Sequence, residues 1–229
     1  MGIRYANITL QGVSQNELVN YLSNIKFDAY VSPTVNEYTV LYDLASIGYP
    51  NKLPKYIQQE YNFSSLYKRY LSPQQAIMAC LCSHLSRKFN CSILAIYIID
   101  GITFWYHLSQ NGYLLDEYIT DNYLHSKIKV SLTDKTATHS AEKLCSAFGK
   151  EYAIAQVKTI LGEPVEKYDS MTRHELLAKA LEIRPCWVVG MNYHCFTGEE
   201  DFEAHYECYR EDCEPCYEEA LQMVKKTIL

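Results

Sequence analysis

The sequence predicts an α+β fold: a mainly antiparallel sheet with a central hairpin meander, helices packed on it, and a helical C-terminal subdomain. Within residues 91–119, the turn dipeptides Asp100-Gly101 and Asn111-Gly112 separate three apolar segments. Both dipeptides suit the positive φ angles of two-residue hairpin turns, so the segments should pair as consecutive antiparallel strands. Strand and helix patterns alternate before this stretch and helix patterns dominate after it, which indicates the α+β class.

The meander also predicts how the sheet is covered. Residues 93–99 are apolar at almost every position. A strand with one face in water would alternate, so this run predicts a strand that is buried on both faces. In the next strand, Trp105 and His107 share the face opposite to Phe104. These two could line a pocket, although aromatic side chains on a sheet more often pack in a core.

Strands and a first helix are predicted before the meander. Alternation of apolar and polar residues predicts strands over residues 3–10, 27–31 and 38–43, the last two joined as a hairpin. Ser14 and Glu17 have the spacing of a capping box, so a helix should begin after Ser14.

A longer helix is predicted directly before the meander. Ser72 is its expected cap, with Pro73 at the first position and Gln75 completing a capping box. Its apolar stripe runs to Phe89 and requires a sheet to pack on. Residues 46–71 contain Gly and Pro breaks, and we expect one or two short helices there, at the edge of the sheet.

The second half of the chain is predicted to be helical, after a polar linker at residues 120–138. Ser140 is the expected cap of a first helix, and residues 152–161 have the period of a second. Thr172 and Glu175 have capping-box spacing for a third.

The domain organisation follows from these elements. Residues 187–190 form a brief apolar run, which we interpret as an added edge strand. We expect residues 1–120 to form the α+β sheet domain. Residues 121–229 should form the helical subdomain, packed on the sheet as one globular unit.

Composition is that of an ordinary globular protein. Of 229 residues, 48% are hydrophobic and 21% are charged, which argues against global disorder. The apolar run at residues 93–99 is shorter than the roughly 20 residues that span a bilayer, so we expect no membrane helix. The N-terminal residues lack a long apolar region, so we expect a soluble cytoplasmic protein with nine reduced cysteines.

Negative charge is concentrated near the C-terminus. Between Glu199 and Glu219 there are ten acidic residues and one basic residue, so this stretch carries −9 and the rest of the chain +3, for a total of −6. An acidic end repels phosphate, so we expect no nucleic-acid partner. The acidic residues either complement the dipole of a helix closed by Lys225 and Lys226, or attract a basic protein partner or a cation.

The same region contains one cluster with the spacing of metal ligands: His205, Cys208, Cys213 and Cys216. Zinc binds four such ligands in a tetrahedron, so a zinc site in a structural protein is one hypothesis. The alternative is two amphipathic helices in which His205 packs with neighbouring aromatic residues and the thiols are buried. Cys213 and Cys216 also have redox-motif spacing, but no strand-to-helix pattern precedes them.

Catalytic patterns are weaker. His194 and Cys195 are adjacent, but neighbours in sequence seldom point at each other, and a catalytic pair meets through the fold. Asp116 and Glu117 should point to opposite faces of their strand, and we expect them to be solvated charges at its end. The sequence has no phosphate-binding glycine loop, dinucleotide fingerprint or His-Glu-x-x-His motif.

Three functions therefore remain open. The 21 tyrosines and the acidic tail favour a non-catalytic protein-interaction or binding module. The alternatives are an enzyme with a Cys/His or carboxylate site, and a zinc-stabilised structural protein. A pocket with convergent ionisable groups would favour an enzyme, whereas a large exposed tyrosine-rich patch would favour an interaction module.

Overall fold

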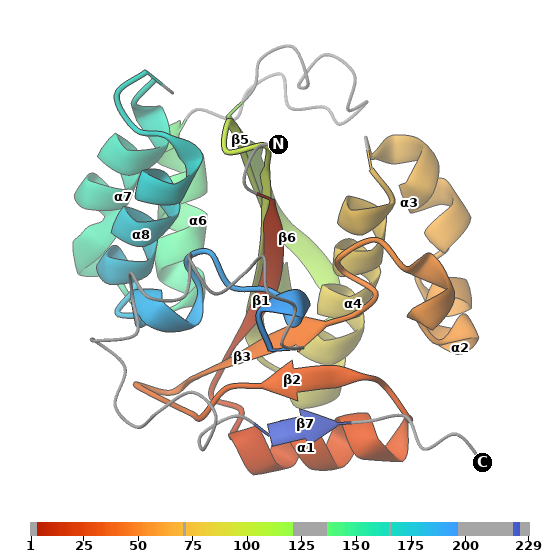
Figure 1. The fold of residues 1–229 in the computed structure, drawn as a ribbon. Helices are drawn as coiled ribbons and strands as arrows, with labels where there is room; N and C mark the ends of the chain where they lie inside the picture. Colours follow the sequence, from red (N-terminus) through yellow and green to blue (C-terminus); the bar gives the residue numbers. More distant parts are fainter. Residues whose placement is uncertain (1–3, 71, 121–136, 165, 197–221, 225–229) are drawn as a thin grey trace.

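The computed structural model describes residues 4–70, 72–120, 137–164, 166–196 and 222–224. Within these residues, a seven-stranded sheet has the order β6-β5-β4-β1-β3-β2-β7, and all neighbouring strands are antiparallel. Figure 1 shows the sheet between two layers of helices. The predicted α+β class with a mainly antiparallel sheet is confirmed. No helix of the described residues combines the length and the apolarity needed to cross a membrane.

The centre of the sheet is β1 (Tyr5–Gln11), which pairs with β3 (Tyr38–Asp43) on one side and β4 (Ser92–Ile99) on the other. β2 (Ala29–Val31) extends the sheet beyond β3. β7 (Gln222–Val224) pairs with β2 and forms that edge. The first strand of the chain is thus the one that holds the two halves of the sheet together.

The edge strand β7 corrects a prediction. We expected the residues before Lys225 and Lys226 to be helical, but residues 222–224 are a strand, with Met223 opposite Tyr30 of β2. The prediction used local charge alone. A strand edge offers unpaired backbone N–H and C=O groups to any segment that reaches it, and the tail sequence does not show that edge.

The predicted meander is confirmed as β4, β5 (Thr103–Gln110) and β6 (Tyr113–Ile119). Both turns have two consecutive positive φ angles, 53° and 71° at Asp100-Gly101 and 54° and 87° at Asn111-Gly112. These angles match the expected two-residue turns, and glycine adopts them at low conformational cost.

Helices bury both faces of β4, as its unbroken apolar run predicts. One face belongs to the core that contains α4 (Pro73–Phe89). The other face belongs to the core that contains α6 (Ala137–Ala147), α7 (Ile154–Gly162) and α8 (Ser170–Ala180). Successive side chains alternate between the two cores, with Ile93, Ala95 and Tyr97 in the first and Leu94, Ile96 and Ile98 in the second.

Ser14 and Ser72 cap α1 and α4 as predicted. α1 (Gln15–Asn24) begins after Ser14, and the reciprocal capping box with Glu17 is present. α4 begins after Ser72, whose hydroxyl accepts a hydrogen bond from the backbone N–H of Gln75. Both helices pack on the same side of the sheet (Figure 1).

The short helices expected after β3 are present, but their place differs. η1 (Pro50–Lys52), α2 (Lys55–Glu60) and α3 (Phe63–Arg69) follow one another along the chain. α2 and α3 contact α4 from the outside instead of lying at the edge of the sheet (Figure 1). The sequence shows apolar residues in this segment but does not show which surface they meet.

Two helices begin earlier than predicted. α8 begins after Asp169, whose carboxylate accepts a hydrogen bond from the backbone N–H of Thr172, so Thr172 lies inside the helix. A carboxylate also interacts favourably with the positive end of the helix dipole, which explains the earlier start. α6 begins at Ala137, and Ser140 is buried within it instead of capping it.

The edge strand predicted at residues 187–190 is absent. η3 (Pro185–Trp187) lies there, followed by a buried segment and then by η4 (Tyr193–Phe196). Two backbone carbonyls that would pair with a neighbouring strand accept from side chains of the sheet instead. Tyr42 Oη donates to the Trp187 carbonyl, and Asn7 Nδ2 donates to the Val188 carbonyl. The apolar run is therefore a buried, non-strand segment that packs in the core.

The division of the chain near residue 120 stays a prediction. Most of the expected linker, residues 121–136, lies outside the described residues. η2 (Glu151–Ala153) precedes α7, and the helices from α6 to α8 share one core with the sheet.

His174 of α8 is buried against the central strand. Its Nδ1 lies 2.8 Å from Tyr5 Oη, and the two rings stack with their centroids 5.7 Å apart. Burial lowers the pKa of His174 from 6.5 to about 3. The imidazole is therefore neutral at physiological pH and serves as a packed hydrogen-bonding ring.

This burial predicts that the protein becomes less stable as the pH falls from about 6.5 towards 3. In that window the unfolded chain protonates His174 and the folded protein does not, so protons favour unfolding. We expect H174F to show a weaker decrease of Tm between pH 6.5 and 4 than the unsubstituted protein. An NMR titration midpoint near 6.5 for His174 would contradict the prediction.

Candidate functional site

The described free thiols are not activated nucleophiles. Burial raises the pKa of Cys80 and Cys91 to about 12 and that of Cys145 and Cys195 to about 11, and it holds the pKa of Cys82 well above its ordinary value. The thiolate is the reactive form, so these residues are protonated at neutral pH. They are free, as predicted.

Cys186 and Cys195 are in different chemical states. Cys186 is disulfide-bonded, so the expectation of reduced thiols throughout the chain is wrong for this residue. Cys195 lies beside His194 in sequence, but its thiol donates to the Gly190 carbonyl at 3.6 Å and approaches Asn192 Oδ1 at 3.7 Å. These contacts give Cys195 a local structural role at the start of η4.

The predicted zinc ligands lie outside the described residues: His205, Cys208, Cys213 and Cys216. The zinc site, the redox interpretation and the role of the acidic tail therefore stay predictions. Within the ranges that the structure describes, no group of three or more His, Cys, Asp or Glu side chains is arranged to hold a metal ion.

Asp116 and Glu117 do point to opposite faces of β6, but the expectation that they are solvated is wrong. Asp116 is 0% exposed and Glu117 is 2% exposed. Asp116 Oδ2 accepts a hydrogen bond from Tyr106 Oη at 2.6 Å. Glu117 accepts from Trp105 Nε1 at 3.1 Å and from Arg69 Nη2 at 3.0 Å. The helices of the two layers cover a strand end that the sequence alone leaves open.

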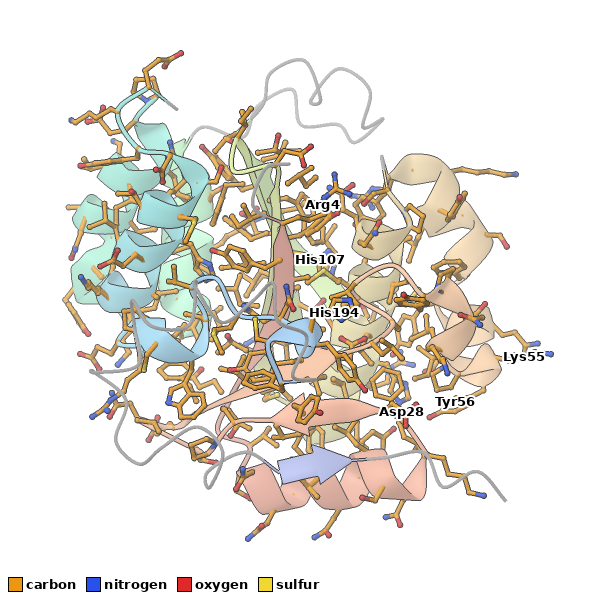
Figure 2. The ribbon with its side chains drawn as sticks, in the orientation of Figure 1. Arg4, Asp28, Lys55, Tyr56, His107 and His194 are labelled. Atoms are coloured by element: carbon orange, nitrogen blue, oxygen red, sulfur yellow. The ribbon has the colours of Figure 1, made fainter. Side chains whose placement is uncertain are left out.

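Glu117 also belongs to a serine–histidine–glutamate chain. His107 Nε2 lies 2.9 Å from Ser109 Oγ, and His107 Nδ1 lies 3.8 Å from Glu117 Oε1. Acyl-transfer enzymes use this order of groups, but they expose the hydroxyl to substrate. Ser109 is 0% exposed and His107 is 2% exposed, and Figure 2 shows His107 between the helix layers. These side chains, together with Arg69, therefore link β5, β6 and α3 inside the core.

The ionisation of Glu117 follows from its neighbours. Burial acts to raise its pKa, but hydrogen bonding with His107 and the charges of His107 and Arg69 outweigh burial, so the pKa is lowered. A buried carboxylate that accepts from Trp105 and Arg69 is stable only while these partners remain in place.

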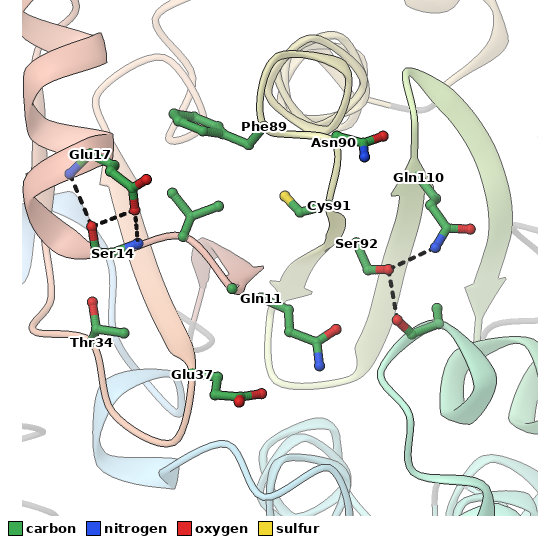
Figure 3. A pocket seen from close by; sticks show the side chains of 13 residues that line it. Gln11, Ser14, Glu17, Thr34, Glu37, Phe89, Asn90, Cys91, Ser92 and Gln110 are labelled. Carbon is green, nitrogen blue, oxygen red and sulfur yellow. Dashed lines mark hydrogen bonds between the residues drawn. The ribbon is translucent and has the colours of Figure 1, made fainter.

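A cleft of about 620 Å³ opens at one end of the sheet (Figure 3). The end of β1, the start of α1, the β2–β3 turn, the C-terminal end of α4 and the ends of β4 and β5 surround it. Its size is within the range of ligand pockets, roughly 300 to 1,000 Å³. Its amide, hydroxyl and carboxylate side chains are three amides, three hydroxyl groups and two carboxylates: Gln11, Asn90, Gln110, Ser14, Thr34, Ser92, Glu17 and Glu37.

Hydrogen bonds within the protein orient the amides of the cleft. Gln110 Nε2 donates to Ser92 Oγ at 3.2 Å, and Ser92 Oγ donates to the Ala147 carbonyl at 2.7 Å. Gln11 Nε2 donates to the Phe148 carbonyl at 3.2 Å. Because the amide nitrogens are used in this way, the two glutamines offer their oxygens as acceptors.

The charge of the cleft is negative. Hydrogen bonds from the Ser14 side chain and backbone lower the pKa of Glu17, so this carboxylate is ionised at neutral pH. Glu37 is exposed in the β2–β3 turn. The C-terminal end of α4 adds the negative end of a 17-residue helix dipole.

A second surface adjoins the cleft. Phe89 lines the cleft and packs edge-to-face on Tyr21, with ring centroids 5.5 Å apart. Tyr21 Oη lies 2.5 Å from His84 Nε2, and Lys88 Nζ lies 5.1 Å from the centre of the Tyr21 ring. Burial lowers the pKa of His84, so its ring is neutral at neutral pH.

Further rings extend this surface. Tyr56 meets His84 edge-on with ring centroids 5.6 Å apart, and Arg87 lies 6.0 Å from the centre of the Tyr61 ring. Tyr113 also interacts with Arg87 and helps to raise the pKa of its guanidinium. Tyr56 is 44% exposed and Tyr113 is 68% exposed. We call this continuous surface the tyrosine patch: Tyr21, Tyr56, Tyr61, Tyr113, His84 and Arg87.

Figure 2 places Tyr56, which belongs to α2, at the periphery of the molecule, in contrast to the interior position of His107. Glu60 binds two members of the patch, with Oε1 at 2.9 Å from Arg87 and Oε2 at 3.2 Å from His84. The patch is therefore held in place by α1, α2 and α4 before any partner arrives.

Sequence reasoning missed both the cleft and the patch. Their residues come from positions as distant as Gln11 and Gln110, or Tyr21 and Tyr113. One local signal was available: Asn36-Glu37 has glutamate where a two-residue turn prefers glycine.

The chain matches no known protein-family model, no curated protein and no solved structure.

Proposed function

We propose that this chain is a non-catalytic protein-interaction module whose partner binds the tyrosine patch. The observation that carries the proposal is the continuous surface of tyrosine rings, an arginine and a histidine over α1, α2 and α4. Tyrosine and arginine are enriched in the centres of protein interfaces, where a few of them supply most of the binding energy.

The fixed geometry of the patch supports the proposal. Tyrosine provides a large contact area with few rotatable bonds, so it loses little conformational entropy when a partner binds. Glu60 and His84 already hold the neighbouring side chains by hydrogen bonds. Ordering cost on binding is therefore reduced, which favours affinity.

The remaining expectations from the sequence belong to this proposal. A basic protein partner and the lack of a nucleic-acid partner are proposed from the charge distribution, and a cytoplasmic location stays part of the same proposal. A zinc-stabilised tail is the alternative that metal analysis of the purified protein would test, since chelation should then lower its Tm.

The double variant Tyr56→Ser and Tyr113→Ser is expected to weaken partner binding by roughly tenfold or more, as expected for interface hot spots. Both rings are exposed, so the fold should be unaffected. The measurement is cross-linking and affinity purification from the native host, followed by quantitative mass spectrometry of each variant.

Tyr152→Ser is the matched control. Tyr152 is 70% exposed in η2, in the helix layer opposite to that of α1 and α4, and it hydrogen-bonds Glu182. The control should retain every partner that the unsubstituted protein captures. A partner that is retained equally by the double variant and the control would sink the assignment of the patch.

A further inference from the structure

We propose that the cleft binds the guanidinium group of an arginine that belongs to the partner seated on the tyrosine patch. The inference rests on the proposed function and names the chemistry that the partner must bring. Phe89 contacts both surfaces, so a segment that crosses the patch would reach the cleft without leaving the protein.

The electrostatics of the cleft favour a cation. Glu17 and Glu37 are the charged side chains that line it, and the C-terminal end of α4 adds partial negative charge. The cations nearby are already paired: Arg87 binds Glu60, and Lys150, whose charge interacts with Glu37, binds Glu182. A ligand with positive charge would therefore meet carboxylates that lack a close cationic partner among the described side chains.

The shape and donors of a guanidinium suit this lining better than those of an ammonium. Gln11 and Gln110 offer amide oxygens from different sides, and two carboxylates stand at the rim. The planar guanidinium has five N–H donors that can reach several such acceptors at once. Its flat face can also stack on the half-buried ring of Phe89, which lysine does less well.

Backbone geometry supports a role for Glu37. The turns Asp100-Gly101 and Asn111-Gly112 have glycine at their second position, whereas the Asn36-Glu37 turn has glutamate at φ 70°. A residue with a side chain is strained there, typically by about 1 kcal/mol or more. The side chain of Glu37 projects into the lining of the cleft, where a glycine would contribute no charge.

The test is an NMR titration of the ¹⁵N-labelled full chain with the peptide acetyl-Ala-Arg-Ala-amide. We expect shifts at Gly12, Cys91 and Gln110, which border the cleft. Replacement of arginine by citrulline keeps the shape and removes the charge, so this peptide should bind at least about tenfold more weakly. The lysine peptide should bind with intermediate affinity, and added salt should weaken binding of both charged peptides.

Variants of the protein complete the test. Glu37→Gln and Glu17→Gln should each weaken binding of the arginine peptide by about three- to fivefold, the range expected for a partly exposed ion pair. Glu142→Gln, an exposed glutamate on α6, is the control and should change nothing. Glu37→Gly should raise Tm by a few degrees because glycine adopts the positive φ of this position without strain. It should also weaken binding of the arginine peptide as much as Glu37→Gln does.

The outcomes separate this inference from the proposed function. Equal binding of the arginine and citrulline peptides, or shifts that do not involve the cleft, would overturn the inference. If the arginine peptide does not bind while the patch variant still loses its partner, the proposed function stands without an arginine site. If the peptide binds as expected but the patch variant retains every partner, the arginine site stands and the patch assignment fails.

Discussion

E117Q is expected to lower the free energy of unfolding by about 3 kcal/mol, the lower end of the cost of breaking a buried ion pair. The carboxylate of Glu117 accepts from Trp105 Nε1 with one oxygen and from Arg69 Nη2 with the other. Glutamine keeps one acceptor and presents an NH₂ group to the second donor. The cost stays near the lower end because Arg69 is 29% exposed and can turn towards water.

The pH dependence of this variant provides a second measurement. The folded pKa of Glu117 is lowered, so its contribution to stability is fully present above the unfolded value of about 4.5 and is lost as the pH falls through the folded pKa. The stability difference between E117Q and the unsubstituted protein should therefore shrink in acid. Urea unfolding at pH 7 and pH 3.5 measures it, with Glu142→Gln as the exposed control.

A stability loss for E117Q no larger than that of the control would contradict the buried network. It would mean that the strand end is open to water, as the sequence had predicted, and that Ser109 and His107 are also accessible. In that case the serine–histidine–glutamate chain would need to be tested as a reactive site.

I93A and L94A are each expected to cost about 2 to 5 kcal/mol, the usual range for truncation of a buried aliphatic side chain. The two residues are neighbours on β4 and point to opposite faces of the sheet. Ile93 is 0% exposed in the core with α4, and Leu94 is 1% exposed in the core with α6, α7 and α8. Large losses at both positions require helices on both faces.

I102A is the matched control for this pair. Ile102 follows the turn between β4 and β5 and is 62% exposed, so its truncation should change stability by less than about 0.5 kcal/mol. Equilibrium unfolding in urea measures all three variants. A loss at Leu94 as small as that at Ile102 would show that the second face of the sheet is not packed.

The candidate site was much less predictable than the fold. Glu17 could be assigned to a capping box from its spacing to Ser14, and the structure confirms that hydrogen bond at 2.9 Å to the Ser14 backbone N–H. Nothing in that spacing shows that Glu17 faces Gln110 across a cleft, because the two are brought together by β1, β4 and β5.

Long-range packing also explains the predictions that were wrong. Trp187 lies in a run whose sequence is typical of a strand, but its backbone carbonyl accepts a hydrogen bond from Tyr42 of β3. Glu117 looks like a strand-end charge, but Arg69 of α3 reaches it. In both cases the deciding partner lies far away in sequence, so no local pattern could reveal it.

The sequence by itself determined the features whose causes lie within a few residues. These are the two-residue turns of the meander, the caps of α1 and α4, and the two-faced burial of β4. Only the tertiary structure decided the burial of Glu117, the pairing of β7 and the meeting of the cleft with the tyrosine patch. The reason is that φ preferences, caps and periodicity act along the chain, whereas charge burial and surface composition depend on which distant segments pack together.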